Sequence, residues 1–338
     1  MQVHDDLKAL SRDAAAWEQG QRTLARTIAA WRTAPEAASV LAALDRFGRK
    51  DPLDSCAALA ALFAKVGDVA PDPAPDPAPD MPSDPARELV SGLMRRGLAA
   101  LAAHPLGQMP FRHAHRQAAD TLLLAHSGTA TLGLAVFDGA ALARQPAPRT
   151  AEFAPVETWF RVLAGSGRGD LTTRDPESAA LRTEALDLVP SMTFHRHGAR
   201  QALQLREVSG SLVVLRLQRL TSLHDPVREV ALGDGDLRSQ AALTAEYSRM
   251  DMAMAALAAL GRQDAVPALS RLVHGQGPAA LRWQALRAIL ALDTRAGLVL
   301  LRTVASSDDP ALSGPARDLH RTLVAQWPEL EKVAQWRG

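Results

Sequence analysis

The spacing of apolar residues changes twice along this 338-residue chain, and this restricts the folds open to it. Up to residue 103, apolar residues recur at helical spacing, as Leu24, Ile28 and Trp31 do. Between residues 121 and 220, short apolar stretches are separated by glycine-containing turns, which is typical of strands. Helical spacing returns after residue 237. The pattern predicts an α+β fold with a central antiparallel β domain between two helical regions.

Composition argues against several classes of function. Hydrophobic residues make up 47% of the chain, so a core can form. The formal net charge of +1 argues against nucleic acid or a membrane surface as a partner. We find no apolar stretch of transmembrane length and no signal-peptide pattern at the N-terminus, so a cytoplasmic protein is expected. Cys56 is the single cysteine, which excludes an internal disulfide, and it is expected to be a buried apolar residue.

These patterns divide the chain into four predicted segments. Residues 1–70 form an N-terminal helical region, in which Pro35 suits the first turn of a helix. Residues 71–86, with the sequence PDPAPDPAPDMPSDPA, form an extended proline-rich linker, because proline donates no backbone hydrogen bond. Residues 87–235 form the β domain with a leading helix, and residues 236–338 form helical repeats.

Within the β domain, strands are predicted at residues 121–125, 131–137, 157–163, 185–189, 202–208 and 211–220. Turns are expected at Asp138-Gly139, at Gly165-Ser-Gly167 and at Ser209-Gly210. The glycine-rich run 165–169 is interpreted as a loop between strands and not as a phosphate cradle, because no convincing helix follows it. Asp236 is expected to cap a helix that begins at residue 237.

An internal repeat occurs in the C-terminal segment. Two apolar runs, which end at Leu260 and Leu292, lie 32 residues apart, and each is followed by a polar turn and a second apolar stretch. Pairs of short helices at this period resemble HEAT-type helical repeats, over about residues 240–330. One unit cannot bury its own apolar face, so neighbouring units must stack. The repeats are therefore expected to bind a protein partner or to brace the β domain.

Two histidine motifs lie in strand-like sequence. The first is His113-Ala-His115, and the second ends at His195. In a strand, residues i and i+2 point to the same face, so His113 and His115 are expected to lie side by side, with His195 joining them from a distant strand. Three neutral imidazoles can ligate one transition metal ion. The predicted metal ligands are therefore His113, His115 and His195, with His197 as a substitute.

The residues around these histidines resemble the two motifs of the cupin superfamily. The opening motif has a glycine, five residues, His-x-His, an acid and a glycine, which correspond to Gly107, His113, His115, Asp120 and Gly128. The closing motif, Pro-x-Gly-x-x-His, corresponds to Pro190, Met192 and His195, with Met192 in place of the glycine. About residues 105–220 resemble the cysteine dioxygenase type in particular. The resemblance implies a small β-barrel that holds iron(II) or another divalent transition metal at the three histidines.

Two hypotheses of different classes follow. The first is a metal-dependent cupin enzyme, such as a non-heme iron oxygenase, acting on a small acid or thiol. Arg112 or Arg200 would pair with a substrate carboxylate. The second is a non-catalytic scaffold or interaction module, with a metal-free barrel and helical repeats. Tyr247, the single tyrosine, lies in the helical segment, so the active-site tyrosine of thiol dioxygenases has no counterpart, which weighs against thiol oxidation itself.

Overall fold

The computed structural model describes residues 13–64 and 84–330, so most of the predicted linker and both ends of the chain lie outside the described residues. The chain divides into two compact units. The first contains residues 1–151, 156–221 and 232–235, and the second contains residues 152–155, 222–231 and 236–338. The domain limits expected from the sequence stay a prediction. Within the described ranges, no helix has both the length and the apolar character needed to cross a membrane.

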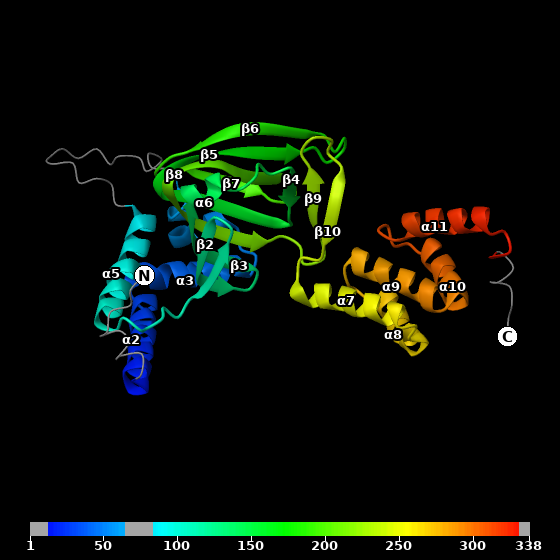
Figure 1. Cartoon of the computed structure of the whole chain (residues 1–338), viewed down its shortest axis with the longest axis horizontal. Helices are drawn as coiled ribbons and strands as arrows, with labels where there is room; N and C mark the ends of the chain where they lie inside the picture. Colours follow the sequence, from blue (N-terminus) through cyan, green and yellow to red (C-terminus); the bar gives the residue numbers. More distant parts are fainter. Residues whose placement is uncertain (1–12, 65–83, 331–338) are drawn as a thin grey trace. The chain divides into compact units, whose positions relative to one another are not determined.

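The N-terminal part of the first unit is helical, in agreement with the spacing of its apolar residues (Figure 1). Its helices are α2 (Ala14–Arg32), α3 (Pro35–Gly48), the 3-10 helix η1 (Leu53–Ser55), α4 (Ala57–Ala61) and α5 (Pro85–Ala103). Pro35 lies in the first turn of α3, as expected. Helix α5 begins before the expected residue 87, because the Asp84 side chain accepts hydrogen bonds from the amides of Ala86 and Arg87.

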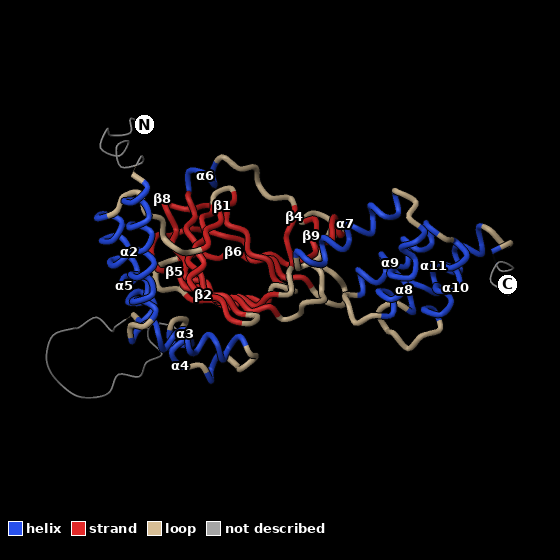
Figure 2. Tube along the Cα trace, turned by 90° about the horizontal axis from the view of Figure 1, so that it is seen from below, coloured by secondary structure: helices blue, strands red, loops and turns tan. Residues whose placement is uncertain are grey.

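The β region of this unit forms a seven-stranded antiparallel sheet (Figure 2). Its strands are β1 (Arg112–Arg116), β2 (Ala119–Ser127), β3 (Ala130–Asp138), β5 (Val156–Arg174), β6 (Leu181–Leu188), β7 (Thr193–His197) and β8 (Gln201–Leu220). The order is β1-β2-β3-β8-β5-β6, and β7 pairs with β5. His113 and His115 thus lie in strand β1, and His195 lies in strand β7. The turn expected after β3 is the first turn of α6 (Gly139–Ala143), capped by the Asp138 side chain.

The sheet is curved but open. Among the described residues, no pairing joins its outer strands β1 and β6, so the closed barrel expected from the sequence is not formed. The curvature comes from β5 and β8, which pair along most of their length and bend together. The observed fold is therefore α+β with antiparallel sheets.

Two of the predicted turns are wrong, because they are bends inside the longest strands. β5 continues through Gly165 and β8 continues through Gly210. The two bends face each other, since Ser166 pairs with Ser209 across a shift in the pairing register. Gly165 and Gly210 have φ values of +78° and +67°. Glycine with positive φ serves a β-bulge as well as a turn, so the local sequence did not distinguish them. The interpretation of residues 165–169 as a loop is likewise wrong.

Alternate side chains of the sheet enter two separate apolar cores. One face packs against α3, α4 and α5, and it contributes Leu132, Leu134, Leu215 and Leu217. Cys56 is buried near this core, as expected. The other face has a core of its own, formed by Phe160, Val162, Leu188, Val208, Leu212 and Val214. A residue of β5 or β8 therefore belongs to one core or the other according to its place in the alternation.

The second unit differs from expectation at its first element. A three-stranded sheet, most of which belongs to this unit, has the order β10-β9-β4, with β4 (Thr150–Phe153), β9 (Val227–Ala231) and β10 (Leu237–Ala241). The prediction of a helix from residue 237 is wrong, because residues 237–241 pair with β9. Thr244, and not Asp236, caps the helix that follows. Residues 237–241 form backbone hydrogen bonds with β9 in place of those that they would have formed within a helix.

The helices of this unit are α7 (Ala245–Ala259), the 3-10 helix η2 (Gln263–Ala265), α8 (Val266–His274), α9 (Ala279–Leu292), α10 (Thr294–Ala305) and α11 (Ser313–Gln326). They share one apolar core, in which Leu269 of α8 and Leu301 of α10 are both buried. These two residues lie 32 positions apart, at the period predicted for the repeat. The identity of the helices as HEAT-like repeats stays a proposal.

Candidate metal centre

Strand register brings a carboxylate to two histidines of β7. His195 and His197 point to the same face of the sheet because they are two residues apart in a strand. On the neighbouring strand β5, Glu157 lies opposite His197 and Trp159 lies opposite His195. This is the face that packs against the N-terminal helices, since Trp159 contacts Phe47 of α3. We call Glu157, His195 and His197 the β5–β7 cluster.

The two oxygens of Glu157 have different partners. Oε1 lies 3.3 Å from Nδ1 of His197 and 3.8 Å from Nε2 of His195. Oε2 accepts a hydrogen bond of 2.8 Å from the Arg219 guanidinium on β8, on the other side of β5. Arg219 also donates to the backbone oxygen of Asp51, which fixes its position. One carboxylate oxygen is thus anchored by a cation, and the other faces two imidazoles.

The ring of His195 is held in place by its neighbours. It stacks on Trp159, with ring centroids 4.4 Å apart and planes 15° apart, and its other contact is the edge of His197. Burial lowers the pKa of His195 below its ordinary value, and the charges of His197 and Arg219 lower it further, while Glu157 opposes the shift. The imidazole of His195 is therefore neutral at pH 7, which is the form that ligates metals.

The β5–β7 cluster fits a transition metal ion. Its ligand atoms, one carboxylate oxygen and two ring nitrogens, all lie within 4.8 Å of one another. Two ligands about 2.1 Å from one tetrahedral zinc ion lie about 3.4 Å apart. The separation from Glu157 Oε1 is 3.3 Å for His197 and 3.8 Å for His195, so the first matches this value and the second is slightly longer. Within the described ranges it is the one group of at least three His, Cys, Asp or Glu side chains with this spacing.

His113 and His115 lie in β1 and share Asp120 of β2 as a partner. The Oδ1 atom of Asp120 lies 2.9 Å from His115 Nδ1 and 3.1 Å from His113 Nε2. These hydrogen bonds lower the pKa of the Asp120 carboxyl, His115 having the larger effect. All three side chains are more than half exposed. The structure brings His113 and His115 together with Asp120 but not into the β5–β7 cluster with His195, and their role as metal ligands stays a prediction.

Other residues singled out in the sequence lie away from the cluster. Arg112 and Arg200 are exposed, and their proposed pairing with a substrate carboxylate stays a prediction. Tyr247 lies in the second unit, in helix α7. Sequence reasoning missed Glu157, because no motif surrounds it. Its one signal was an acid near the start of a predicted strand, and only the pairing of β5 with β7 gives that acid its neighbours.

Comparisons with known proteins give only distant likenesses. No protein-family model matches the chain, and no curated protein is detectably related to it. Among solved structures, HutD from Pseudomonas fluorescens SBW25 is 15% identical at a TM-score of 0.23, over 32% of this chain and 56% of that one. A cupin superfamily protein from Desulfitobacterium hafniense DCB-2 is 17% identical at a TM-score of 0.22, over 32% and 82%.

Hydroxypropylphosphonic acid epoxidase from S. wedmorenis is 13% identical at a TM-score of 0.25, over 32% of this chain and 56% of that one. The chain thus spans little more than half the length of HutD and of the epoxidase. At such low TM-scores these likenesses carry no argument about function.

Proposed function

We propose that the chain is a metal-dependent, cupin-like protein whose β5–β7 cluster holds one divalent transition metal ion. Two imidazoles and one carboxylate are the ligand set typical of non-heme iron(II) oxygenases, so iron(II) is the proposed metal. The observation that supports the proposal is the gathering of the three ligand atoms within 4.8 Å. His195 is one of the three metal ligands predicted from the sequence, and His197 was predicted as a substitute ligand.

Neighbouring side chains prepare these residues for ligation. Arg219 binds one oxygen of Glu157, which turns the other towards the imidazoles. Trp159 restricts rotation of the His195 ring by stacking on it. Residues that orient metal ligands in this way are a regular part of metal sites, because they reduce the cost of assembling the ligands.

The proposed reaction is the oxidation of a small acid or thiol by dioxygen. Glu157, His195 and His197 would hold the iron(II), which would supply this oxidation chemistry. The side chain of His197 is 60% exposed, whereas that of Glu157 is 16% exposed. A substrate would therefore approach from the side of His197, while Glu157 and Arg219 lie deeper, at the helix-covered part of the sheet.

The test is the metal content of purified protein after anaerobic loading with iron(II), measured by elemental mass spectrometry. We expect close to one iron per chain in the wild type and far less than one in His195→Ala and His197→Ala, since each removes a ligand. The Glu157→Gln variant keeps the size of the side chain and is expected to lose affinity as well. Oxygen uptake with small acids and thiols then tests the oxygenase activity.

The matched control is the double variant His113→Ala/His115→Ala, which removes two imidazoles from β1. It is expected to bind iron as the wild type does. Loss of iron in this variant, with retention in His195→Ala and His197→Ala, would contradict the proposed ligand set and favour a site in β1.

The second candidate function is a non-catalytic interaction module with HEAT-like repeats and a metal-free β domain. The observation that favours it is an apolar groove of about 550 Å³ along α9, α10 and α11, lined by Leu290, Leu298, Leu319, Leu323 and Trp327. Such a groove suits the apolar face of an amphipathic helix from a protein partner. Absence of iron, and of every other transition metal tried, from the loaded wild type would favour this function over the first.

A further inference from the structure

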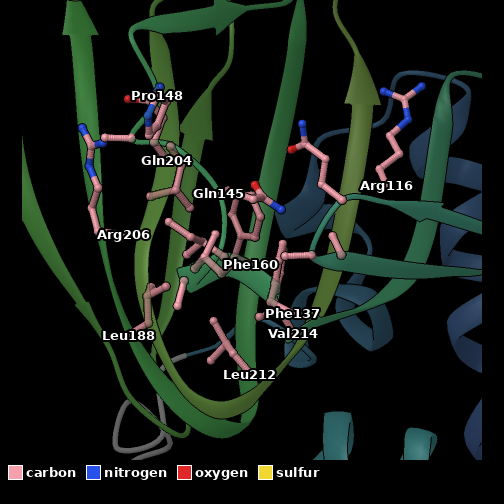
Figure 3. Close-up of a pocket in the computed structure, with 18 of the residues that line it drawn as sticks. Arg116, Phe137, Gln145, Pro148, Phe160, Leu188, Gln204, Arg206, Leu212 and Val214 are labelled. Carbon is pink, nitrogen blue, oxygen red and sulfur yellow. The ribbon is translucent and has the colours of Figure 1, made fainter. Parts of the chain in front are cut away.

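A cavity of about 940 Å³ lies in the first unit, on the other face of the sheet from the β5–β7 cluster (Figure 3). The alternation along β7 separates the two. Phe194 and Arg196 line the cavity, whereas His195 and His197 point to the opposite face. The cavity is therefore distinct from the proposed metal centre, and neither depends on the other for its side chains.

The walls of the cavity are mostly apolar. Phe160 and Phe194 stack on each other with ring centroids 4.5 Å apart. Figure 3 shows Leu188, Leu212 and Val214 gathered at one end, and Gln204 and Arg206 towards the other. Pockets for small organic ligands have volumes of about 300–1,000 Å³ and mainly apolar walls with a few polar groups. The cavity has both properties.

All charged residues of the lining are arginines, namely Arg116, Arg149, Arg196, Arg206 and Arg216. No carboxylate lines the cavity within the described part of the chain. Arg206 is neutralised by Asp170, 2.6 Å away. An apolar cavity that concentrates guanidinium groups and excludes carboxylates favours an anion over a cation or a neutral molecule.

Among the arginines of the lining, Arg216 is the one whose surroundings most favour binding of an anion. It lies in β8 between Phe160 of β5 and Gly133 of β3, in a row of side chains where no neighbour is acidic. Among the described residues, no hydrogen bond or ion pair reaches its guanidinium, and burial alone lowers its pKa. Arg216 is partly buried, and a partly buried cation without a partner is unfavourable. A ligand carboxylate would remove that cost by pairing with the planar guanidinium.

Gln204 supplies a second polar position in the lining. Its side-chain nitrogen donates to the backbone oxygen of Thr150, while its Oε1 atom is buried without a hydrogen-bond partner among the described residues. An unsatisfied buried acceptor is also unfavourable unless a ligand or water donates to it. Gln204 therefore adds a second polar side chain with an unsatisfied atom to the lining of the cavity.

We propose that this cavity binds a small organic carboxylate with an aromatic or aliphatic body, whose charged group pairs with Arg216. The apolar body lies against Phe160 and Phe194. The site is independent of the proposed metal centre.

The test is calorimetric titration of the full chain with 3-phenylpropionate and, separately, with its uncharged amide. We expect the wild type to bind the carboxylate at least tenfold more tightly than the amide, because a charge-assisted bidentate pair forms only with the carboxylate. Arg216→Gln is expected to lose at least tenfold in affinity for the carboxylate with little change for the amide. Arg182→Gln, at a highly exposed position of β6, is the control and is expected to bind as the wild type does.

Arg216→Gln is expected to fold, because it removes a cation that no described residue neutralises. A second pair of variants does not touch this position. Ala143, an exposed residue of the lining, is replaced by Glu or by Lys, and only Ala143→Glu is expected to weaken binding of the carboxylate. Equal binding of the acid and its amide, no binding of 3-phenylpropionate by the wild type, or unchanged binding by Arg216→Gln would each overturn the proposal.

Discussion

At the scale of single residues, the interactions of each histidine depend on the acidic residue on the neighbouring strand. Asp120 lies opposite His115 in a hairpin of nearby residues, and it takes both exposed imidazoles of β1 as partners. Glu157 lies opposite His197 and is anchored from behind by Arg219. In β1, two imidazoles are hydrogen-bonded to one oxygen of Asp120. In the β5–β7 cluster, one carboxylate oxygen and two ring nitrogens surround a common point.

The hydrogen bonds to Asp120 make a prediction that is independent of any metal. Because His115 and His113 stabilise the ionised carboxylate, they hold its pKa below the ordinary value of 3.8. Replacing His115 with Ala removes the larger contribution and is expected to raise the pKa of Asp120 towards that value. Titration of the Asp120 side-chain carbon by NMR measures this, with His126→Ala of β2 as the control. An unchanged pKa in His115→Ala would show that the imidazole does not bind Asp120 in solution.

The histidines were predictable from the sequence as strand residues, but their partners were not. Spacing by two residues places His113 beside His115, and His195 beside His197, wherever the strands lie. The partner of each pair depends on the register between strands, and a shift of one residue would turn every side chain to the other face. Glu157 and Arg216 therefore gave no recognisable signal, since each gains its role only from cross-strand neighbours.

At the scale of elements, one buried ion pair fastens helix α5 to the sheet. Arg161 of β5 is 2% exposed and lies 2.9 Å from Asp84, the residue that caps α5. Arg161 also donates to the backbone oxygen of Ala64. The same aspartate thus starts the helix and neutralises a buried cation.

Removal of Asp84 is expected to lower the free energy of unfolding by far more than the loss of a helix cap alone would. Asp84→Ala leaves Arg161 buried without its charge partner, so we expect the free energy of unfolding to fall by about 3–5 kcal/mol. Asp13 is the control, because it caps α2 in the same way and pairs with no buried cation among the described residues, and Asp13→Ala is expected to lower the free energy of unfolding by about 1 kcal/mol. Native-state hydrogen exchange of β5 amides measures both. Equal losses would contradict a role for the ion pair.

The paired bends of β5 and β8 make a second prediction at this scale. Gly165 and Gly210 both have positive φ, which costs a residue with a side chain about 1–2 kcal/mol. A Cβ atom at Gly165 would also collide with the backbone oxygen of Ser211, whereas one at Gly210 would meet nothing. Gly165→Ala is therefore expected to destabilise β5 by about 3 kcal/mol or more, and Gly210→Ala by about 1–2 kcal/mol. Hydrogen exchange that ranks the two variants in the opposite order would contradict the described bend.

Helices of the first unit were easier to predict than strands, for a physical reason. A helix satisfies its backbone within one segment, so apolar spacing and a signal such as Pro35 in the first turn of α3 largely define it. The backbone hydrogen bonds of a strand depend on a second strand, which the local sequence does not specify. Residues 237–241 became a strand because β9 was available, and the glycines of β5 and β8 became bends because each strand supports the other.

At the scale of the whole molecule, one sheet separates two chemically different sites. The β5–β7 cluster offers a carboxylate and two imidazoles, whereas the cavity behind it offers guanidinium groups and aromatic rings. Because their side chains belong to opposite faces, the two ligands are expected to bind without competing. Saturation with cobalt(II) should leave the affinity for 3-phenylpropionate within about twofold in calorimetric titration, since 1.4 kcal/mol of coupling would already give tenfold. Mutual exclusion of the two ligands would contradict the separation of the sites.

Anomalous X-ray diffraction locates a bound metal ion directly and therefore tests whether the β5–β7 cluster is the metal centre. Crystals of the full chain grown with cobalt(II) would be measured on both sides of the cobalt absorption edge. We predict one strong anomalous peak among Glu157 Oε1, His195 Nε2 and His197 Nδ1, at distances of about 2.0–2.2 Å. A peak beside His113 and His115, or no peak at the β5–β7 cluster in cobalt-saturated crystals, would contradict it.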